Sequence, residues 1–186
     1  MPPASLRAIS TIFLDRDGTI NVKPAEGEYV TSPADLVLLP GAAGAVARAN
    51  AAGLRIVLVT NQRWLSGPAG DPARYAAVHA RLEELLAAEG AWLDAAYYCP
   101  HAAAACDCRK PGPGMLQRAA REYPIELDKA VIIGDSDSDL MAGRAAGTAT
   151  ILLRPGAASA AAHADAVADD LRGAVRLILQ ARNAPG

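Results

Sequence analysis

The sequence predicts an α/β fold of the doubly wound (Rossmann-like) class, in which helices cover both faces of one parallel sheet to give three layers. Short apolar runs alternate with helical segments about five times along the chain, and this alternation is typical of such sheets. One run, Arg55–Thr60, is almost continuously apolar, as expected of a parallel strand buried on both faces. Polar residues follow the ends of several runs, where doubly wound sheets bind their ligands.

Composition limits the classes of protein that need consideration. The 186 residues suit a single domain, predicted over 1–186 with its core at about 9–182. The net charge of −2, the pI near 5.9 and the aromatic content of 4% argue against a nucleic-acid partner. The first ten residues lack the apolar stretch of a signal peptide, and no run approaches the length of a membrane span. We therefore expect a cytoplasmic protein without a membrane partner.

The first half of the chain predicts two strands joined through a long loop and a helix. The first strand is Thr11–Leu14, and a proline-containing loop follows over Asn21–Pro40. An alanine-rich helix is predicted over Gly41–Ala52, and Gly53 follows it in the usual position after a helix. The second strand is Arg55–Thr60.

The second half continues the same alternation. Asp71 and Pro72 are typical of a helix N-cap and first turn. The remaining helices are predicted at Ala73–Glu89, Gly114–Glu122, Asp137–Ala146 and Asp170–Ala181, and the remaining strands at Ala95–Tyr98, Ala130–Ile133 and Ala149–Leu153. The last residues, Asn183–Gly186, are expected to form a frayed tail.

Polar side chains stand at the ends of three predicted strands. Asp15 and Asp17 follow the first strand, Asn61 follows Thr60 at the end of the second, and Asp135 follows the strand that ends at Ile133. Each could be an ordinary capping residue, or a solvated turn in the case of the two acids. Parallel strands open onto one crevice at their carboxyl ends, so the joint placement favours a binding site.

These acids suit phosphoryl transfer. We assign Asp15 as a nucleophile that attacks phosphorus, because aspartate forms aspartyl-phosphate intermediates. Asp17 is assigned as the general acid and base. Magnesium, which prefers oxygen ligands, would be held by Asp15, the backbone carbonyl of Asp17 and Asp135. Asp139 is a possible outer partner of the metal, and Asp137 is as well explained as an acid at a helix N-terminus.

Four further residues are candidates for substrate binding. Thr60 and Asn61 can form hydrogen bonds to phosphate oxygens, and Lys110 can neutralise charge on the phosphoryl group. Lysine is rare in this chain, so Lys110 beside Arg109 stands out. The alternative is an ordinary solvated basic pair.

A second constellation consists of three thiols and one imidazole. Cys99, His101, Cys106 and Cys108 lie within ten residues of one another, and these ligand types match a closed tetrahedral Zn²⁺ site. The short spacings do not match a common zinc finger. With no open coordination position, zinc is expected to be structural and to hold this loop in place.

The motifs together resemble one known family. They occur in the order Phe13–Asn21 (FLDRDGTIN), Thr60–Gln62 (TNQ), Tyr97–His101 (YYCPH), Cys106–Pro111 (CDCRKP) and Gly134–Asp135. This pattern, covering about residues 9–155, resembles the capless, zinc-bearing phosphatases of the haloacid dehalogenase superfamily, whose branch contains D-glycero-D-manno-heptose 1,7-bisphosphate 7-phosphatases and histidinol-phosphate phosphatases. The resemblance implies the sheet order 3-2-1-4-5, no cap domain, dependence on Mg²⁺, a monomer, and a zinc loop that carries Arg109 and Lys110 to a small sugar phosphate.

Within this branch the motifs are closer to the heptose enzymes, although two features depart from them. Arg63, Trp64 and the residues after them replace a Ser-Gly-Ile-like stretch, and only four alanines separate His101 from Cys106, as in the histidinol-phosphate pattern. Arg63 could bind a distal phosphate and Trp64 could pack on the sugar, or both could be ordinary loop residues.

Histidinol-phosphate or broader sugar-phosphate hydrolysis stays open as an alternative. A receiver-like signalling domain and a zinc-dependent interaction module agree less well with the pair of acids and the strand-end residues.

Overall fold

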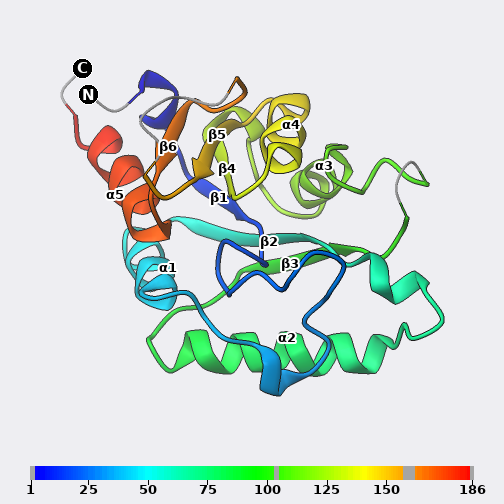
Figure 1. The fold of residues 1–186 in the computed structure, drawn as a ribbon. Coiled ribbons are helices and arrows are strands. Elements are labelled where there is room, and N and C mark those ends of the chain that lie inside the picture. Colours follow the sequence, from blue (N-terminus) through cyan, green and yellow to red (C-terminus); the bar gives the residue numbers. More distant parts are fainter. Residues whose placement is uncertain (1–2, 103–104, 157–161, 185–186) are drawn as a thin grey trace.

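The computed structural model describes residues 3–102, 105–156 and 162–184, and their strands form one parallel sheet. Its order is β3-β2-β1-β4-β5-β6, as Figure 1 shows. The strands are β1 (Thr11–Leu14), β2 (Arg55–Asn61), β3 (Ala95–Cys99), β4 (Ala130–Gly134), β5 (Ala149–Leu153) and β6 (Ala166–Ala168). The predicted doubly wound fold and the order 3-2-1-4-5 are confirmed.

The helices follow the predicted alternation with small shifts at their ends. They are α1 (Ala42–Ala51), α2 (Pro72–Ala87), α3 (Gly114–Glu122), α4 (Asp137–Ala146) and α5 (Leu171–Arg182), with short 3-10 turns at Ala4–Leu6, Pro33–Asp35, Arg63–Ser66 and Leu127–Lys129. Asp71 caps α2 through the backbone N–H of Ala73. Asp170, predicted as the first residue of the last helix, instead caps α5 from outside by accepting from the N–H of Gly173.

The sequence did not predict the sixth strand. Strand β6 contains only Ala166, Val167 and Ala168 and pairs with the edge of β5. Two of its three residues are alanines, which have low β-propensity, and three residues give no readable periodicity. This strand therefore depends on its pairing partner rather than on its own pattern.

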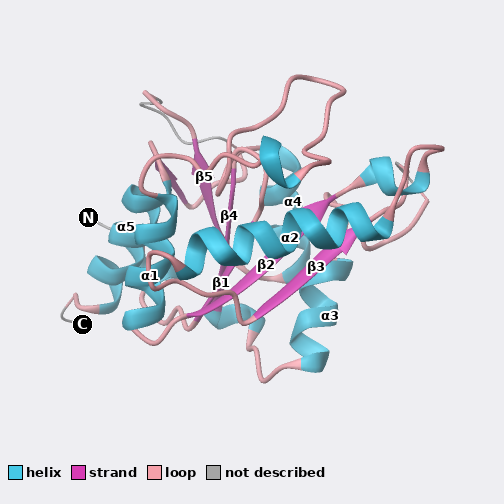
Figure 2. Ribbon diagram, turned by 90° about the horizontal axis from the view of Figure 1, so that it is seen from below, coloured by secondary structure: helices cyan, strands magenta, loops and turns pink. Residues whose placement is uncertain are grey.

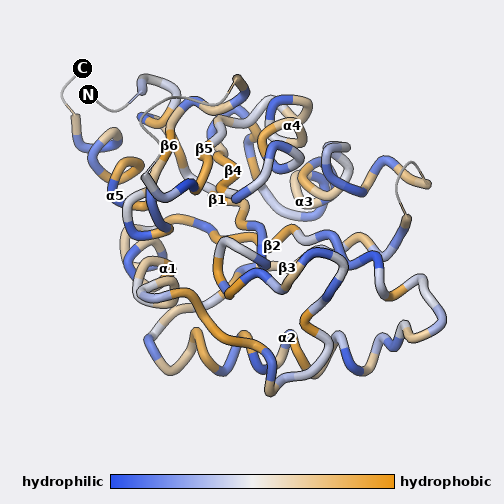
Figure 3. The backbone as a smooth tube through the Cα atoms, viewed as in Figure 1, coloured by the Kyte–Doolittle hydropathy of each residue, from blue (hydrophilic) through white to orange (hydrophobic). Residues whose placement is uncertain are grey.

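Two apolar cores lie on opposite faces of the sheet. Helices α1, α2 and α5 pack on one face and α3 and α4 on the other, as Figures 1 and 2 show. Successive residues of β1 point to alternate cores: Ile12 and Leu14 into the first, Phe13 into the second. Figure 3 shows the hydrophobic colouring concentrated along the central strands. This arrangement leaves the carboxyl ends of the strands as the polar edge of the sheet.

The pairing of the central strands brings their polar ends together. Leu14, the last residue of β1, is in register with Leu58 of β2 and with Ile133 of β4. The residues that follow these strands therefore converge on the point where the strand order reverses, between β1 and β4. In the described parts of the chain, the connections between strands hold no inserted cap domain, and none of the helices has the length and apolar character needed to cross a bilayer.

Candidate active site

Lys110 forms a buried ion-pair network with two acids from distant parts of the chain. Its Nζ lies 2.7 Å from Oδ1 of Asp15 and 2.6 Å from Oδ1 of Asp139, and it donates to the carbonyl of Val59 at 2.8 Å. Lys110 is 3% exposed and Asp139 is fully buried. The ammonium group therefore donates hydrogen bonds to Asp15 and Val59 and forms a second ion pair with Asp139. A buried charge is tolerated when it is paired and hydrogen-bonded in this way.

Burial and neighbouring charges shift the pKa values of Asp15 and Lys110. Burial raises the pKa of Asp15 to about 7, although the charge of Lys110 opposes this rise. Burial alone would lower the pKa of Lys110, but Asp139 and Asp15 outweigh it and the pKa is raised. Lys110 therefore stays cationic, and Asp15 is a carboxylate whose ionisation depends on the charges around it.

Two local features place the partners of this network. The side chain of Asn61 donates to the carbonyl of Lys110 at 3.0 Å and accepts from its N–H at 3.1 Å. Asp139 lies in the first turn of α4, where its Oδ2 accepts from the N–H and the hydroxyl of Ser136. Gly134 makes room for it, because a Cβ added there would overlap the Asp139 carboxylate.

A group of three carboxylates forms the candidate magnesium site. Asp15, Asp135 and Asp139 each place an oxygen within 4.8 Å of the other two. Asp135 accepts from Nζ of Lys23 at 2.6 Å, and Gly18 passes so close to Asp135 that a side chain there would overlap it. A divalent cation that prefers oxygen fits this donor set.

The carboxylate of Asp17 belongs to a different set of contacts. Arg16 pairs with it through Nε and Nη2, at 3.0–3.2 Å. Asn21 donates to its Oδ1 and Gln62 to its Oδ2, each at 3.0 Å. Five hydrogen bonds thus fix a side chain that is 18% exposed at the cavity.

The predicted binding residues surround one cavity of about 600 Å³. Asp15, Asp17, Asp135 and Asp139 line its acidic side. Thr60, Asn61, Arg109, Lys110 and Lys23 also line it. The structure therefore brings together all the residues that the sequence indicated for substrate and magnesium. Arg63, by contrast, is not among the residues that line this cavity.

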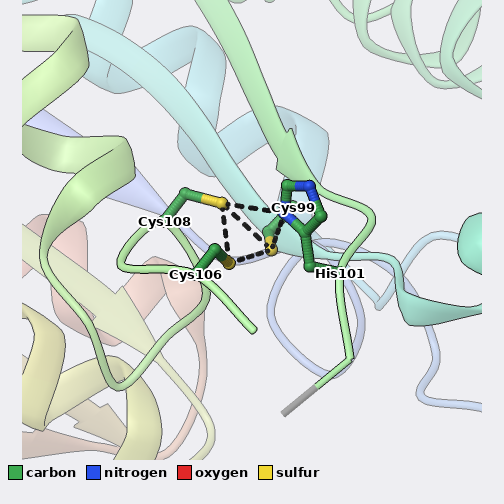
Figure 4. A group of neighbouring side chains, drawn as sticks. All are labelled: Cys99, His101, Cys106 and Cys108. Atoms are coloured by element: carbon green, nitrogen blue, oxygen red, sulfur yellow. Dashed lines mark hydrogen bonds between the residues drawn. The ribbon is translucent and has the colours of Figure 1, made fainter. Parts of the chain in front are cut away.

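The thiols and the imidazole also converge, as predicted. Figure 4 shows Cys99 at the end of β3 and His101, Cys106 and Cys108 on the loop after it, with their side chains pointing toward one another. The sulfur–sulfur distances are 3.0–3.5 Å, and Nδ1 of His101 lies 3.3 Å from Sγ of Cys108. A tetrahedral zinc ion with bonds of about 2.3 Å would place sulfurs about 3.8 Å apart, so the four atoms fit such an ion with small adjustments.

Comparison with known proteins defines the class of this protein. A family model described as HAD-hydrolase-like matches residues 107–174. The crystal structure of D,D-heptose 1,7-bisphosphate phosphatase from Bordetella bronchiseptica, complexed with magnesium and phosphate, is similar with a TM-score of 0.83 and 35% identity, over 92% of this chain and 99% of that one. Fold and family model together define a HAD-like hydrolase.

Two relatives of known name identify the family of this chain within the HAD-like hydrolases. The D-glycero-β-D-manno-heptose-1,7-bisphosphate 7-phosphatase of Pseudomonas aeruginosa is 37% identical over 79% of this chain and 82% of its own length. The D-glycero-D-manno-heptose-1,7-bisphosphate 7-phosphatase of Thermosynechococcus vestitus is 40% identical, over 90% and 94%. The chain belongs to the family of heptose-1,7-bisphosphate 7-phosphatases.

Sequence reasoning missed several residues of this site. The sequence indicates Asp139 only as a possible outer partner of the metal, whereas its carboxylate contacts Lys110 directly and lies within the group of acids that could hold a metal ion. It gave no role to Lys23, which lies 112 residues from its partner Asp135. It quoted Gln62 as part of a motif without a role, although Gln62 is fully buried among polar groups. The available signal for Gln62 was its position directly after the two strand-end residues Thr60 and Asn61.

Proposed function

We propose that this chain hydrolyses the C7 phosphate of a D-glycero-D-manno-heptose 1,7-bisphosphate through an aspartyl-phosphate intermediate. One observation carries the proposal: in a chain of this family, the Asp15 carboxylate lies at the cavity within 2.7 Å of the Lys110 ammonium and beside the carboxylates of Asp135 and Asp139. Phosphoryl transfer depends mainly on such positioning and charge neutralisation.

The chemistry proceeds in two steps. In the first, an oxygen of Asp15 forms a bond to phosphorus while the bond from phosphorus to the C7 oxygen breaks, and Asp17 gives that oxygen a proton. In the second, Asp17 removes a proton from water, the water oxygen bonds to phosphorus, and the bond to Asp15 breaks. The products are heptose 1-phosphate and inorganic phosphate.

Basic and polar side chains bind the two phosphates. Lys110 neutralises charge on the transferred phosphoryl group, and the hydroxyl of Thr60 donates to one of its oxygens. The side-chain amide of Asn61 donates one N–H to the carbonyl of Lys110 and accepts from its backbone N–H, so its second N–H is left for a phosphate oxygen. The guanidinium of Arg109, on the cavity wall, is suited to the distal phosphate.

Two metals complete the proposal. Asp15, Asp135 and the backbone carbonyl of Asp17 would hold Mg²⁺, with Asp139 adjacent, and the ion would supply charge neutralisation at the phosphate. Cys99, His101, Cys106 and Cys108 would hold a structural Zn²⁺ and thereby fix the loop that ends in Arg109 and Lys110.

A substrate panel tests this proposal. Phosphate release with Mg²⁺ would be measured for both anomers of heptose 1,7-bisphosphate, for histidinol phosphate and for unrelated sugar phosphates. We expect the largest kcat/KM for a heptose bisphosphate. The short segment between His101 and Cys106 favours histidinol phosphate as the second candidate, and a far larger kcat/KM for that ester would overturn the heptose assignment.

A cytoplasmic monomer as the working form is also part of the proposal. Light scattering after size-exclusion chromatography, and fractionation of the source cells, test these two points separately from the chemistry.

A further inference from the structure

Gln62 links the general acid to a neighbouring loop through three hydrogen bonds. Its Nε2 donates to Oδ2 of Asp17 at 3.0 Å and to Oγ1 of Thr60 at 2.9 Å. Its Oε1 accepts from the indole N–H of Trp64 at 2.9 Å. Gln62 is fully buried, so water does not compete for these contacts.

The indole determines which end of the amide faces the active site. Trp64 carries only a donor at this position, so it must meet the carbonyl oxygen of Gln62. The two N–H groups of the amide are then directed to Asp17 and Thr60. Rotating the amide by half a turn would place N–H against N–H at Trp64 and carbonyl oxygen against carboxylate at Asp17, which is unfavourable at both contacts, whereas the hydroxyl of Thr60 could donate instead of accept.

The orientation of the Gln62 amide affects Asp17 and Thr60, which both line the cavity. Gln62 donates to Oδ2 of Asp17 from outside the loop of that residue. The other donors to the Asp17 carboxylate are close to it in sequence: Arg16, which contacts both oxygens, and Asn21, which donates to Oδ1. Oγ1 of Thr60 accepts from Gln62, so its own proton is left to be donated toward the cavity that Thr60 lines. One amide thus holds the carboxylate in place and directs the hydroxyl.

We propose that Gln62 and Trp64 are positioning residues for the hydrolysis, which fix the carboxylate of Asp17 where the leaving oxygen is protonated. This inference rests on the proposed function, because it takes Asp17 as the general acid. Trp64 lies on the 3-10 turn Arg63–Ser66 and is half-buried, and its indole acts through Gln62 rather than on the sugar.

The test compares two esters that differ in their need for a general acid. A sugar phosphate releases an alkoxide that requires protonation, whereas p-nitrophenyl phosphate releases a stable phenolate that does not. For Gln62→Met, which keeps the length of the side chain but not its donors, we expect kcat/KM for heptose bisphosphate to fall at least about tenfold further than for p-nitrophenyl phosphate. Trp64→Phe removes only the indole N–H contact, and we expect a smaller change in the same direction, about threefold.

Controls separate positioning from a general structural role. Trp92→Phe alters the other tryptophan, which is 53% exposed. The ratio of kcat/KM for heptose bisphosphate to kcat/KM for p-nitrophenyl phosphate should stay unchanged in this variant. Gln62→Glu keeps the acceptor for Trp64 but loses the N–H donors, so it should also lower the ratio of kcat/KM for heptose bisphosphate to kcat/KM for p-nitrophenyl phosphate. This variant replaces Gln62→Met in the test if Gln62→Met does not fold. Equal losses for the two esters in folded Gln62 variants would overturn this inference alone. A wild-type chain that hydrolyses neither ester would overturn the proposed function and this inference with it.

Discussion

At the scale of single residues, the proposed hydrolysis depends on the environment of Asp15. Its carboxylate is buried, paired with Lys110, and close to the carboxylates of Asp135 and Asp139. Lys110 contacts Asp15 and Asp139, and Lys23 contacts Asp135, so these three carboxylates have two ammonium groups beside them. A divalent cation would add the positive charge that offsets their mutual repulsion. This arrangement is costly for stability, and binding of a metal and a phosphate explains it.

Asp15→Asn should abolish turnover while leaving the fold intact. The amide is isosteric but is not a nucleophile, so kcat for heptose bisphosphate should fall by about 10³-fold or more. Lys110 retains Asp139 as a partner in this variant. Asp137→Asn is the matched control, because Asp137 is an exposed acid of the same region and should keep activity within about threefold. Full activity in Asp15→Asn, together with native circular dichroism, would reject Asp15 as the nucleophile.

The raised pKa of Asp15 predicts a dependence of stability on pH when magnesium is omitted. Between pH 3.8 and about 7 the folded protein keeps a proton on Asp15 that the unfolded chain has lost. The contribution of this group to the free energy of unfolding therefore falls as the pH rises through that window, by at most about 1.4 kcal/mol per pH unit. Urea unfolding should give Asp15→Asn a less negative slope against pH than the wild type. Parallel slopes for the two proteins would contradict the raised pKa.

At the scale of elements, Gly134 at the end of β4 leaves the space in which Asp139 of α4 contacts Lys110. Gly134→Ala would place a methyl group against the Asp139 carboxylate and push it from Lys110. We expect a loss of about 1–3 kcal/mol in stability and at least about tenfold in kcat. Gly44→Ala is the matched control, because an added Cβ there meets open space on α1 and should be neutral or stabilise by up to about 1 kcal/mol. Equal behaviour of the two variants in urea unfolding and kinetics would argue against this role of Gly134.

The loop after β3 is the second element with a specific prediction. His101→Ala removes one of the four residues proposed to hold zinc, so the purified variant should hold less zinc by mass spectrometry. Hydrogen exchange should accelerate in the loop that leads to Lys110, and KM should rise or activity be lost, while α5 keeps its protection as an internal reference. His163→Ala changes an exposed histidine outside the cluster and should retain the metal. A verified zinc-free protein with unchanged kinetics would exclude this role for the ion.

At the scale of the whole molecule, the sheet and most of the site could be predicted from the sequence. Apolar runs such as that of β2 determine strands wherever both faces are covered, and parallel strands necessarily bring Asp15, Asn61 and Asp135 to one edge. The order of the strands came from the resemblance to a family. Strand β6 could not be predicted, because its three residues depend on pairing with β5.

The contacts that escaped prediction are long-range and individually unremarkable in sequence. The lysine that meets Asp135 is one of several charges in a proline-containing loop, and no periodicity links the two. Asp139 has the spacing of an ordinary acid in a first helical turn, and only tertiary packing shows that it is fully buried against Lys110. Strand-end position predicts that residues meet, but it does not predict which atoms pair.

The most direct test of the account is to trap the phosphorylated enzyme. Heptose bisphosphate and Mg²⁺ would be mixed with the protein, the reaction quenched during turnover, and any acyl phosphate reduced with borohydride before peptide mass spectrometry. We expect residue 15 to be converted from aspartate to homoserine only when substrate and Mg²⁺ are both present. Rapid release of phosphate with unmodified Asp15, or with the label on another carboxylate, would contradict it.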